Sequence, residues 1–256
     1  MIHPSALVDS AATLGANVTV GPFSVIGPDV EIGEGTWIGP HVVISGPCRI
    51  GRENRIFQFC SVGEVPQDKK FAGEDSRLEI GDRNVIREGA TLHRGTGAGG
   101  GLTCVGDDNL LMAYVHVAHD CKIGNSVIMA NNASLAGHVT LGDYAILGGF
   151  TLVHQFCAIG AHSFSAMGSA ISKDVPPYTM VAGNPAEPHG LNSEGLKRRG
   201  FSVEVQRALR QAYRVLYRSG LGREQALAQM ADLAQAHPEV ALLHAFVRDS
   251  KRSIVR

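Results

Sequence analysis

The sequence predicts a mainly β protein, a parallel β-helix that is followed by a small α-helical domain. An aliphatic residue recurs at every sixth position over two thirds of the 256 residues, and a small residue commonly follows it four positions later. The repeat stops after Pro176 and Pro177, where helical patterns begin. A short fixed period of this kind is typical of solenoids in which each repeat forms one side of a coil.

The six-residue repeat explains each side of the coil. The aliphatic positions are Ile2, Val8, Leu14, Val20, Ile26, Ile32, Ile38, Ile44, Ile50, Ile56 and Val62, then Ile80, Ile86 and Leu92, and, one residue out of register, Val105, Leu111, Val117, Ile123, Met129, Leu135, Leu141, Leu147, Val153 and Ile159, with Ile171 near the end. These residues should point inward, and Gly or Asn near the corners tolerates unusual backbone angles. Three sides close a triangular coil of about eighteen residues, and roughly nine coils at about 4.8 Å give a prism of about 40 Å.

Two segments interrupt the repeat and are expected to be loops. Residues 66–79 place Asp68 and Glu74 where inward aliphatics are due, and residues 95–104 add one residue and a run of glycines. The glycine run lacks the Gly-Lys-Ser/Thr of a phosphate-binding loop, so a flexible loop is the better interpretation. Loops on a rigid scaffold often carry function.

The C-terminal third divides into two further parts. The predicted β-helix occupies residues 1–177, residues 178–200 are expected to be an irregular connection, and residues 201–256 form the helical domain. Ser202 is expected to cap a helix that ends near Arg218. A second helix fits 223–236, and Pro238 is expected to start a third in its first turn.

Composition excludes several classes of protein. The formal net charge is −1 and no basic block precedes the C-terminal part, so nucleic acid is not an expected partner. No apolar run is long enough to span a bilayer, and the repeat begins at residue 2, which leaves no room for a signal peptide. The five cysteines lack paired metal-ligand spacing and favour a reducing, cytoplasmic location.

The densest group of polar residues falls in the most regular part of the repeat. A step of eighteen residues stacks His119 over Gly137 and Gln155, and the same step stacks Asp120 over His138. The alternative is that these are ordinary surface positions of a solenoid, but four histidines within forty residues favour a site. The segments are HVAHDC at 116–121, LAGHV at 135–139 and VHQFC at 153–157.

A zinc site of the kind found in hexapeptide carbonic anhydrases is the metal-dependent alternative. His116 and His119 are three residues apart, whereas the two close histidines of that family are five apart. No metal is therefore expected, although the sequence alone does not exclude three converging ligands.

At these residues the chain resembles the UDP-N-acetylglucosamine O-acyltransferase family of hexapeptide-repeat transferases, which carries out the first acylation of lipid A biosynthesis. The similarity extends over the full length, including QDKKFAG in the first loop and the helical tail, and its most specific elements are HVAHDC, QDKK and GLKRRGF. The resemblance implies a left-handed coil, a homotrimer with active sites between neighbouring prisms, and no cofactor besides the thioester of acyl carrier protein.

The resemblance also implies roles for individual residues in moving an (R)-3-hydroxyacyl group from acyl carrier protein to the 3-hydroxyl of UDP-N-acetylglucosamine. His119 matches the general base, Asp120 the residue that orients it, and the amide of Gly137 the oxyanion donor. Because adjacent strand residues point to opposite faces, the role of Asp120 depends on a corner between it and His119. Positions that match substrate contacts are Asp68, Lys70, His93, His116, His138, Gln155, Asn192, Glu194 and Arg199.

Two further positions match determinants of the acyl donor. Arg198 corresponds to a basic residue that helps to receive the acidic carrier protein, although a solvated turn is the alternative interpretation. Met167 stands where some members have glycine, and we expect it to close the acyl groove early and select a shorter chain; the alternative is that it only fills space.

A close rival is an N-acyltransferase that acts on a 3-amino UDP-sugar, because the sequence near the acceptor position does not distinguish oxygen from nitrogen as the nucleophile. A non-catalytic β-helix used for assembly is a third possibility, which the polar wall and the tail motifs disfavour. The sequence leaves the preferred acyl length and the affinity between subunits open.

Overall fold

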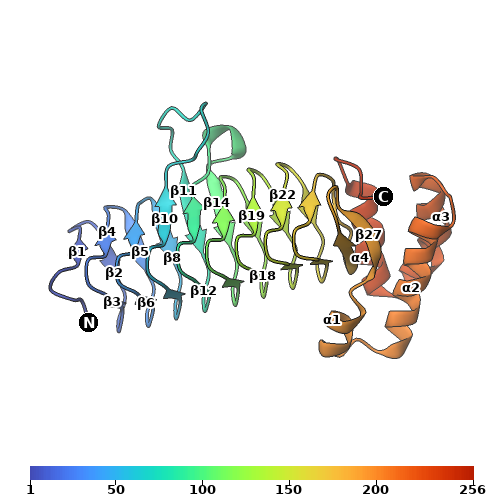
Figure 1. Ribbon diagram of the computed structural model, residues 1–256, viewed down its shortest axis with the longest axis horizontal. Coiled ribbons are helices and arrows are strands. Elements are labelled where there is room, and N and C mark those ends of the chain that lie inside the picture. Colours follow the sequence, from blue (N-terminus) through green and yellow to red (C-terminus); the bar gives the residue numbers. More distant parts are fainter.

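The computed structural model describes residues 1–256 as a long three-sided prism with a group of helices at its C-terminal end (Figure 1). Each side of the prism is one β-sheet whose strands are parallel, apart from the last strand of the third sheet, and the chain visits the three sheets in turn. Paired strands are eighteen residues apart in the regular coils, as in Leu7 with Val25 and His116 with Ser134. The fold is the left-handed parallel β-helix that the resemblance implied.

The first face of the prism has nine strands. They are β1 (Leu7–Val8), β4 (Val25–Ile26), β7 (Val43–Ile44), β10 (Ser61–Glu64), β13 (Thr91–His93), β16 (His116–Val117), β19 (Ser134–Leu135), β22 (Leu152–Val153) and β25 (Ala170–Ile171).

The second face has eight strands. They are β2 (Thr13–Leu14), β5 (Val30–Ile32), β8 (Cys48–Ile50), β11 (Arg77–Ile80), β14 (Leu102–Val105), β17 (Lys122–Ile123), β20 (Thr140–Leu141) and β23 (Ala158–Ile159).

The third face has ten strands. They are β3 (Thr19–Val20), β6 (Trp37–Ile38), β9 (Arg55–Ile56), β12 (Val85–Ile86), β15 (Leu110–Leu111), β18 (Ile128–Met129), β21 (Ile146–Leu147), β24 (Phe164–Ser165), β26 (Thr179–Ala182) and β27 (Glu187–Leu191).

The inward positions form one continuous core of 40 buried residues along the prism. From Leu14 onward the residue four positions after each aliphatic is buried, as Val42 and Ala133 illustrate, whereas at the open N-terminal end Ala6 and Ala12 are only partly buried and Ile2 is exposed. Four of the five cysteines occupy this position and are buried, and Cys104 is only partly covered. The inward-facing pattern read from the sequence is therefore confirmed.

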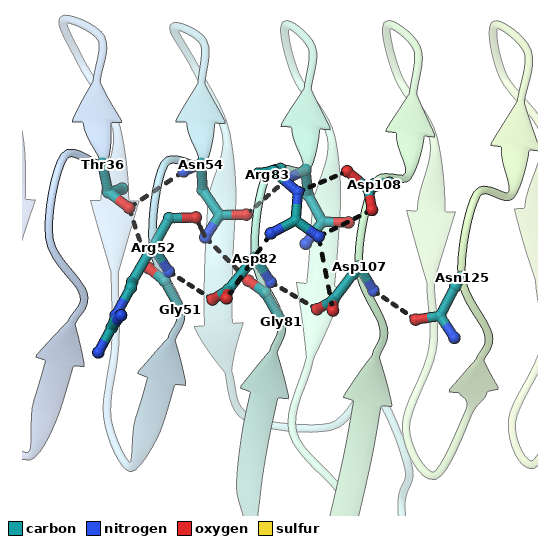
Figure 2. A network of polar contacts seen from close by, with 11 residues as sticks. Thr36, Gly51, Arg52, Asn54, Gly81, Asp82, Arg83, Asp107, Asp108 and Asn125 are labelled. Carbon is teal, nitrogen blue, oxygen red and sulfur yellow. Dashed lines mark hydrogen bonds and ion pairs between the residues drawn. The ribbon is translucent and has the colours of Figure 1, made fainter.

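The corners of the prism depend on residues with positive φ and on side chains that accept hydrogen bonds from backbone N–H groups. Most corners place a non-glycine residue at positive φ, for example Asp108 at 59°. Figure 2 shows the corner between the second and third faces, where Asp82 accepts the N–H of Arg52 and Asp107 accepts the N–H of Asp82, both at 2.7 Å. Each such bond ties one coil to the next and satisfies an amide that the short strands leave unpaired.

The two interruptions are loops, but each is shorter than expected. The first ends where β11 begins at Arg77, and the second ends where β14 begins at Leu102 and contains a short 3₁₀ helix, η1 (Gly97–Gly99). Both loops project from the same side of the prism (Figure 1). The loops are shorter because the residues that follow them, in β11 and β14, pair with each other as parallel strands of the second face. The repeat pattern does not reveal this pairing.

Residues 178–200 are not irregular, which corrects the prediction for this segment. They form β26, the antiparallel strand β27 and the helix α1 (Ser193–Arg198). β26 continues the third face, and β27 folds back along it as a hairpin, so the segment has neither the six-residue period nor clear alternation.

The helical domain matches the sequence prediction in detail. It consists of α2 (Val203–Arg218), which Ser202 caps, α3 (Arg223–Ala236) and α4 (Pro238–Asp249). A separate cluster of 12 buried residues holds these helices together. No helix is long and apolar enough to cross a membrane. The C-terminus returns to the prism, where Asp174 pairs with Ile254.

Candidate active site

The corner between the first and second faces carries the polar wall that the eighteen-residue step predicts. His119 and Asp120 lie in the turn between β16 and β17, and Gly137 and His138 lie in the turn one coil later. A Cβ atom built on Gly137 would lie 2.5 Å from Cε1 of His119, so the imidazole covers this glycine directly. Gln155 is exposed in the next turn, between β22 and β23.

His119 and Asp120 are joined by a hydrogen bond although they are adjacent in the chain. His119 Nδ1 lies 2.7 Å from Asp120 Oδ2. Asp120 has φ of 61°, so the chain turns a corner at this residue and its side chain does not alternate to the opposite face. A carboxylate oxygen only accepts, so Nδ1 carries the proton and neutral His119 keeps the lone pair on Nε2. In this arrangement Nε2 can accept a proton while Asp120 fixes the orientation of the ring.

Asp120 is held by Thr96 of the second loop and by Thr103 of β14. Its side chain is 2 % exposed. Thr96 donates its backbone N–H to Oδ1 at 2.9 Å and its hydroxyl to Oδ2 at 2.7 Å, and Thr103 accepts the N–H of Asp120 at 2.7 Å. Sequence reasoning missed both threonines, because the inserted residues remove the eighteen-residue spacing. The adjacent glycine run was the available signal that the chain makes a close approach here.

His138 lies beside this pair and stacks on Phe156. The ring centroids of His138 and Phe156 are 4.3 Å apart and nearly parallel, and His138 Nε2 is 3.7 Å from Asp120 Oδ2, too far for a hydrogen bond. Burial lowers the pKa of His138, and the charge of Asp120 opposes that effect. A neutral imidazole at pH 7 leaves its ring nitrogen free for a substrate hydroxyl.

His93 and His116 form a second pair on the first face. Their ring centroids are 5.4 Å apart, His93 Nδ1 donates to Val65 O at 2.7 Å, and His116 Nδ1 lies 2.7 Å from the Thr91 hydroxyl. Burial, together with the neighbouring His93 and His119, lowers the pKa of His116. The hydrogen bond at Nδ1 fixes the ring of each histidine and leaves its Nε2 available to contact a ligand.

Asp68 and Lys70 lie on the first loop, where the N–H of Lys70 donates to Asp68 Oδ1 at 3.0 Å. Asp68 is close enough to raise the pKa of His138 slightly against the effect of burial. The Lys70 side chain is exposed. The loop therefore brings the carboxylate of Asp68 near the polar corner, with an exposed lysine two residues later.

The C-terminal residues that were expected to contact substrate or the carrier protein lie elsewhere on the molecule. Asn192, Glu194, Arg198 and Arg199 line a pocket of about 680 Å³ between α1 and the third face. The guanidinium carbon of Arg199 lies 3.8 Å from the ring centroid of Tyr144. The His119 corner joins the first and second faces, so the third face is the side of the prism opposite to it. The structure thus separates the predicted site residues into two groups.

Met167 lies in neither group. It occupies the corner between the third and first faces, after β24, and is 78 % exposed. Its neighbour Ser165, which takes a core position, bonds the hydroxyl of buried Thr151 at 2.8 Å. Met167 is therefore a projecting apolar side chain and does not fill a gap in the core.

His119, Asp120 and His138 also satisfy the distance requirement for a metal site, with potential ligand atoms within 4.8 Å of one another. The bonding pattern suits a proton-transfer site better. Both oxygens of Asp120 already accept hydrogen bonds from Thr96, and His119 Nδ1 faces Asp120 and not an open position. A metal ion would have to displace these bonds.

Comparison with known proteins supports the family resemblance that the motifs indicate. A family model described as UDP N-acetylglucosamine O-acyltransferase, domain 2, matches residues 174–255, and a model of the bacterial transferase hexapeptide matches residues 105–137. Proteins named acyl-[acyl-carrier-protein]–UDP-N-acetylglucosamine O-acyltransferase from Stutzerimonas stutzeri and Pseudomonas aeruginosa are 59% and 57% identical over 256 residues, which is 100% of this chain and 99% of each relative.

Solved structures of this kind superpose closely on the whole chain. The UDP-N-acetylglucosamine acyltransferase of Francisella novicida has a TM-score of 0.98 at 44% identity and covers 100% of this chain and 94% of its own. The UDP-N-acetylglucosamine O-acyltransferase of Moraxella catarrhalis has a TM-score of 0.98 at 46% identity, with coverage of 100% and 99%.

Proposed function

The chain belongs to the UDP-N-acetylglucosamine O-acyltransferase family, and from this premise we infer that it is an enzyme that transfers an acyl group from acyl carrier protein to UDP-N-acetylglucosamine in lipid A biosynthesis. We propose that the acyl group is an (R)-3-hydroxyacyl chain and that the acceptor is the 3-hydroxyl of the sugar. The observation that carries the mechanism is the His119–Asp120 pair at 2.7 Å.

We propose that His119 acts as the general base. A free sugar hydroxyl is far too weak an acid to lose its proton first, so Nε2 takes the proton as the oxygen attacks the thioester carbon. The new C–O bond forms, the C–S bond breaks, and the proton passes from Nε2 to the sulfur of the departing carrier. Asp120 keeps Nδ1 protonated and stabilises the imidazolium that forms between these events. The thioester is the only activated group that this reaction requires.

The amide of Gly137 is placed to stabilise the oxyanion of the tetrahedral intermediate. It lies beneath the His119 ring, and its N–H donates to no group of the chain. Without a side chain at this position the thioester carbonyl has room to approach the amide.

Sugar contacts are proposed for the polar residues that surround this pair. Asp68, His138 and Gln155 are assigned to the glucosamine, and Lys70, His93 and His116 to the remainder of the cleft. Lys70 is a mobile cation suited to a phosphate. On α1, Asn192, Glu194 and Arg199 are assigned to the nucleotide, and Arg198 to the acidic carrier protein.

The site is proposed to be shared between copies in a homotrimer. One substrate must contact both the His119 corner and the α1 pocket, which lie on opposite sides of one prism. From Val85 to Met180 the outward residues of the third face are apolar, although Thr19 and Arg55 take the same position in earlier coils. Those of the second face are mostly polar or charged, which favours the C-terminal part of the third face as the contact surface. The third-face residues are Val85, Leu110, Ile128, Ile146, Phe164 and Met180, and the second-face residues are Glu31, Arg49, Glu79, Lys122 and Thr140.

Subunit complementation tests the shared site. We expect His119→Ala and Arg199→Ala each to abolish most activity, and co-expression of the two to recover about a quarter of the parental rate, because random mixing pairs an intact His119 with an intact Arg199 at about one interface in four. Light scattering of the parental protein should give the mass of three chains. Activity of the mixture no higher than the mean of the separate variants would show that both residues act within one chain.

The cytoplasm is the proposed location, because the acyl carrier protein is a soluble intracellular donor and the five cysteines are unpaired. The reaction itself is tested by incubating the purified protein with UDP-N-acetylglucosamine and hydroxyacyl carrier protein and identifying the product by mass. A single ester on the sugar supports the proposal. Exclusive reaction with a 3-amino analogue, giving an amide, would replace it with the N-acyltransferase.

A further inference from the structure

Thr96 makes two hydrogen bonds to the carboxylate of Asp120, one to each oxygen. Thr96 is only 3% exposed, so both hydrogen bonds are shielded from water. Hydrogen bonds to a charged group are stronger than those between neutral groups, and a buried carboxylate without them would be costly. Thr96 therefore contributes directly to how the Asp120 carboxylate is oriented.

The glycine run after Thr96 is what allows the second loop to close over Asp120. The Thr96 hydroxyl accepts the N–H of Gly99 at 3.1 Å, which makes Thr96 the N-cap of η1. A Cβ atom on Gly99 would lie 2.1 Å from the carboxylate carbon of Asp120, and Gly100 adopts φ of 95°. Any side chain at position 99 would push the loop away from the carboxylate.

The second loop is also tied to the first loop, which carries Asp68 and Lys70. Glu74 Oε1 accepts the N–H of Gly97 at 3.1 Å, and its Oε2 accepts the N–H of Ala72 at 2.8 Å. These backbone bonds lower the pKa of Glu74, so the carboxylate is charged at neutral pH. Glu74 thus connects the segment that holds Asp120 with the segment that approaches His138.

We propose that Thr96 is a positioning residue for acyl transfer, holding the Asp120 carboxylate so that His119 presents Nε2 to the acceptor, and that Glu74 links this arrangement to the Asp68–Lys70 loop. The inference rests on the acyl transfer proposed above. Thr96 has no contact with the reacting atoms, and its effect passes through Asp120 and His119.

The geometry predicts which kinetic constant changes. Without the Thr96 hydroxyl, Oδ2 of Asp120 loses one of its two donors, and the carboxylate is held less firmly about its Cβ–Cγ bond. His119 then spends less time in the productive orientation, which slows the chemical step. The sugar and nucleotide contacts remain, so the KM for UDP-N-acetylglucosamine should stay within about two-fold of the parental value.

The experiment compares Thr96→Val, which keeps the shape and removes the hydroxyl, with Thr96→Ser, which keeps the hydroxyl. The matched control is Thr36→Val, another buried threonine whose hydroxyl donates to Gly51 O and accepts the N–H of Asn54 in the corner of Figure 2, far from the site. Calorimetric binding of UDP-N-acetylglucosamine to each variant verifies that the site is folded.

We expect Thr96→Val to lower kcat about ten-fold, Thr96→Ser to keep at least about half of it, and Thr36→Val to leave it unchanged. In an Asp120→Asn background, Thr96→Val should cost less than about two-fold, because the charged acceptor is already absent. Parental kcat in Thr96→Val, or a full ten-fold loss in the Asp120→Asn background, would overturn the proposal. An inactive parental protein would instead overturn the acyltransferase function itself.

Glu74→Ala tests the link between the loops. The parental chain and the Thr96→Val variant serve as references. We expect Glu74→Ala to raise the KM for UDP-N-acetylglucosamine several-fold and to lower kcat, because the Asp68–Lys70 loop and the Thr96 segment are both released. An effect confined to KM would mean that the first loop binds substrate without any connection to Asp120.

Discussion

The imidazole of His119 lies over Gly137, so closely that a Cβ atom at position 137 would come within 2.7 Å of Nε2. The base and the proposed oxyanion donor are therefore neighbours in space, although eighteen residues separate them in the chain. One coil step places a proton acceptor and a backbone N–H at the same corner of the prism. Acyl transfer to a hydroxyl needs these two groups within reach of one carbonyl carbon.

Gly137→Ala should therefore damage catalysis without unfolding the prism. The added methyl group displaces the His119 ring and occupies the approach to the amide, so we expect kcat/KM to fall by at least about 100-fold. Gly222→Ala is the matched control, because its Cβ would meet nothing nearer than 3.8 Å. Steady-state kinetics beside thermal unfolding gives the answer, and a Gly137→Ala enzyme with near-parental kinetics would remove the oxyanion role.

Met167 should determine acyl chain length. Its side chain is exposed at the corner between the first face and the third face, which we propose as the contact surface between subunits. Met167→Gly should shift the preferred donor toward longer hydroxyacyl chains and leave the KM for UDP-N-acetylglucosamine unchanged. Competition between carrier proteins bearing chains of different length measures this preference, and an unaltered preference would contradict the role.

Only one cysteine should react readily in the folded protein. Burial raises the pKa of all five thiols, but Cys104 is the only one that is partly exposed, and the thiolate is the reactive form. The pKa of Cys48 and Cys121 is raised to about 12, and that of Cys60 and Cys157 to about 11. A disulfide reagent should modify one thiol per chain quickly, and Cys104→Ser should abolish that fast phase. Rapid modification of several thiols in the native protein would contradict the buried core positions.

His162 should make stability depend on pH in the acidic range. Burial, with help from the charge of Arg199, lowers its pKa to about 4, against about 6.5 in an unfolded chain. Between these two pH values the unfolded chain binds a proton that the folded chain does not. The contribution of His162 to the free energy of unfolding is therefore fully present above about pH 6.5 and falls as the pH drops toward 4.

The variant His162→Phe tests this pH dependence, because it keeps a ring between Tyr144 and Tyr178 and removes the titration. Urea unfolding at several pH values should give a flatter slope for the variant between pH 6.5 and 4. Equal slopes for the two proteins would show that other groups govern the acid dependence.

Regular parts of the molecule were predictable because one number, the eighteen-residue coil, relates positions on all three faces. That number alone predicts that His119 lies over Gly137. It did not reveal that Asp120 turns back toward His119, which depends on a positive φ at that residue. It also could not locate Thr96, which is 24 residues before Asp120 because a loop intervenes.

The structure of residues 178–200 is not predictable from the sequence for a different reason. β27 pairs antiparallel with β26 through an irregular register, so its side chains follow neither the six-residue repeat nor a simple alternation. The short helix α1 has only six residues and depends on Asn192 as its cap. The position of α1 against the third face is a tertiary contact, and the local sequence contains no sign of it.

The central claim is that His119 is the base in acyl transfer to UDP-N-acetylglucosamine. The most direct measurement is the rate of ester formation from hydroxyacyl carrier protein by the parental enzyme, by His119→Ala, and by His3→Ala as a control at an exposed histidine in the first coil. We predict parental rates for His3→Ala and a loss of at least about 1,000-fold for His119→Ala, with UDP-N-acetylglucosamine still bound. Ester formation by His119→Ala at the parental rate would contradict the account.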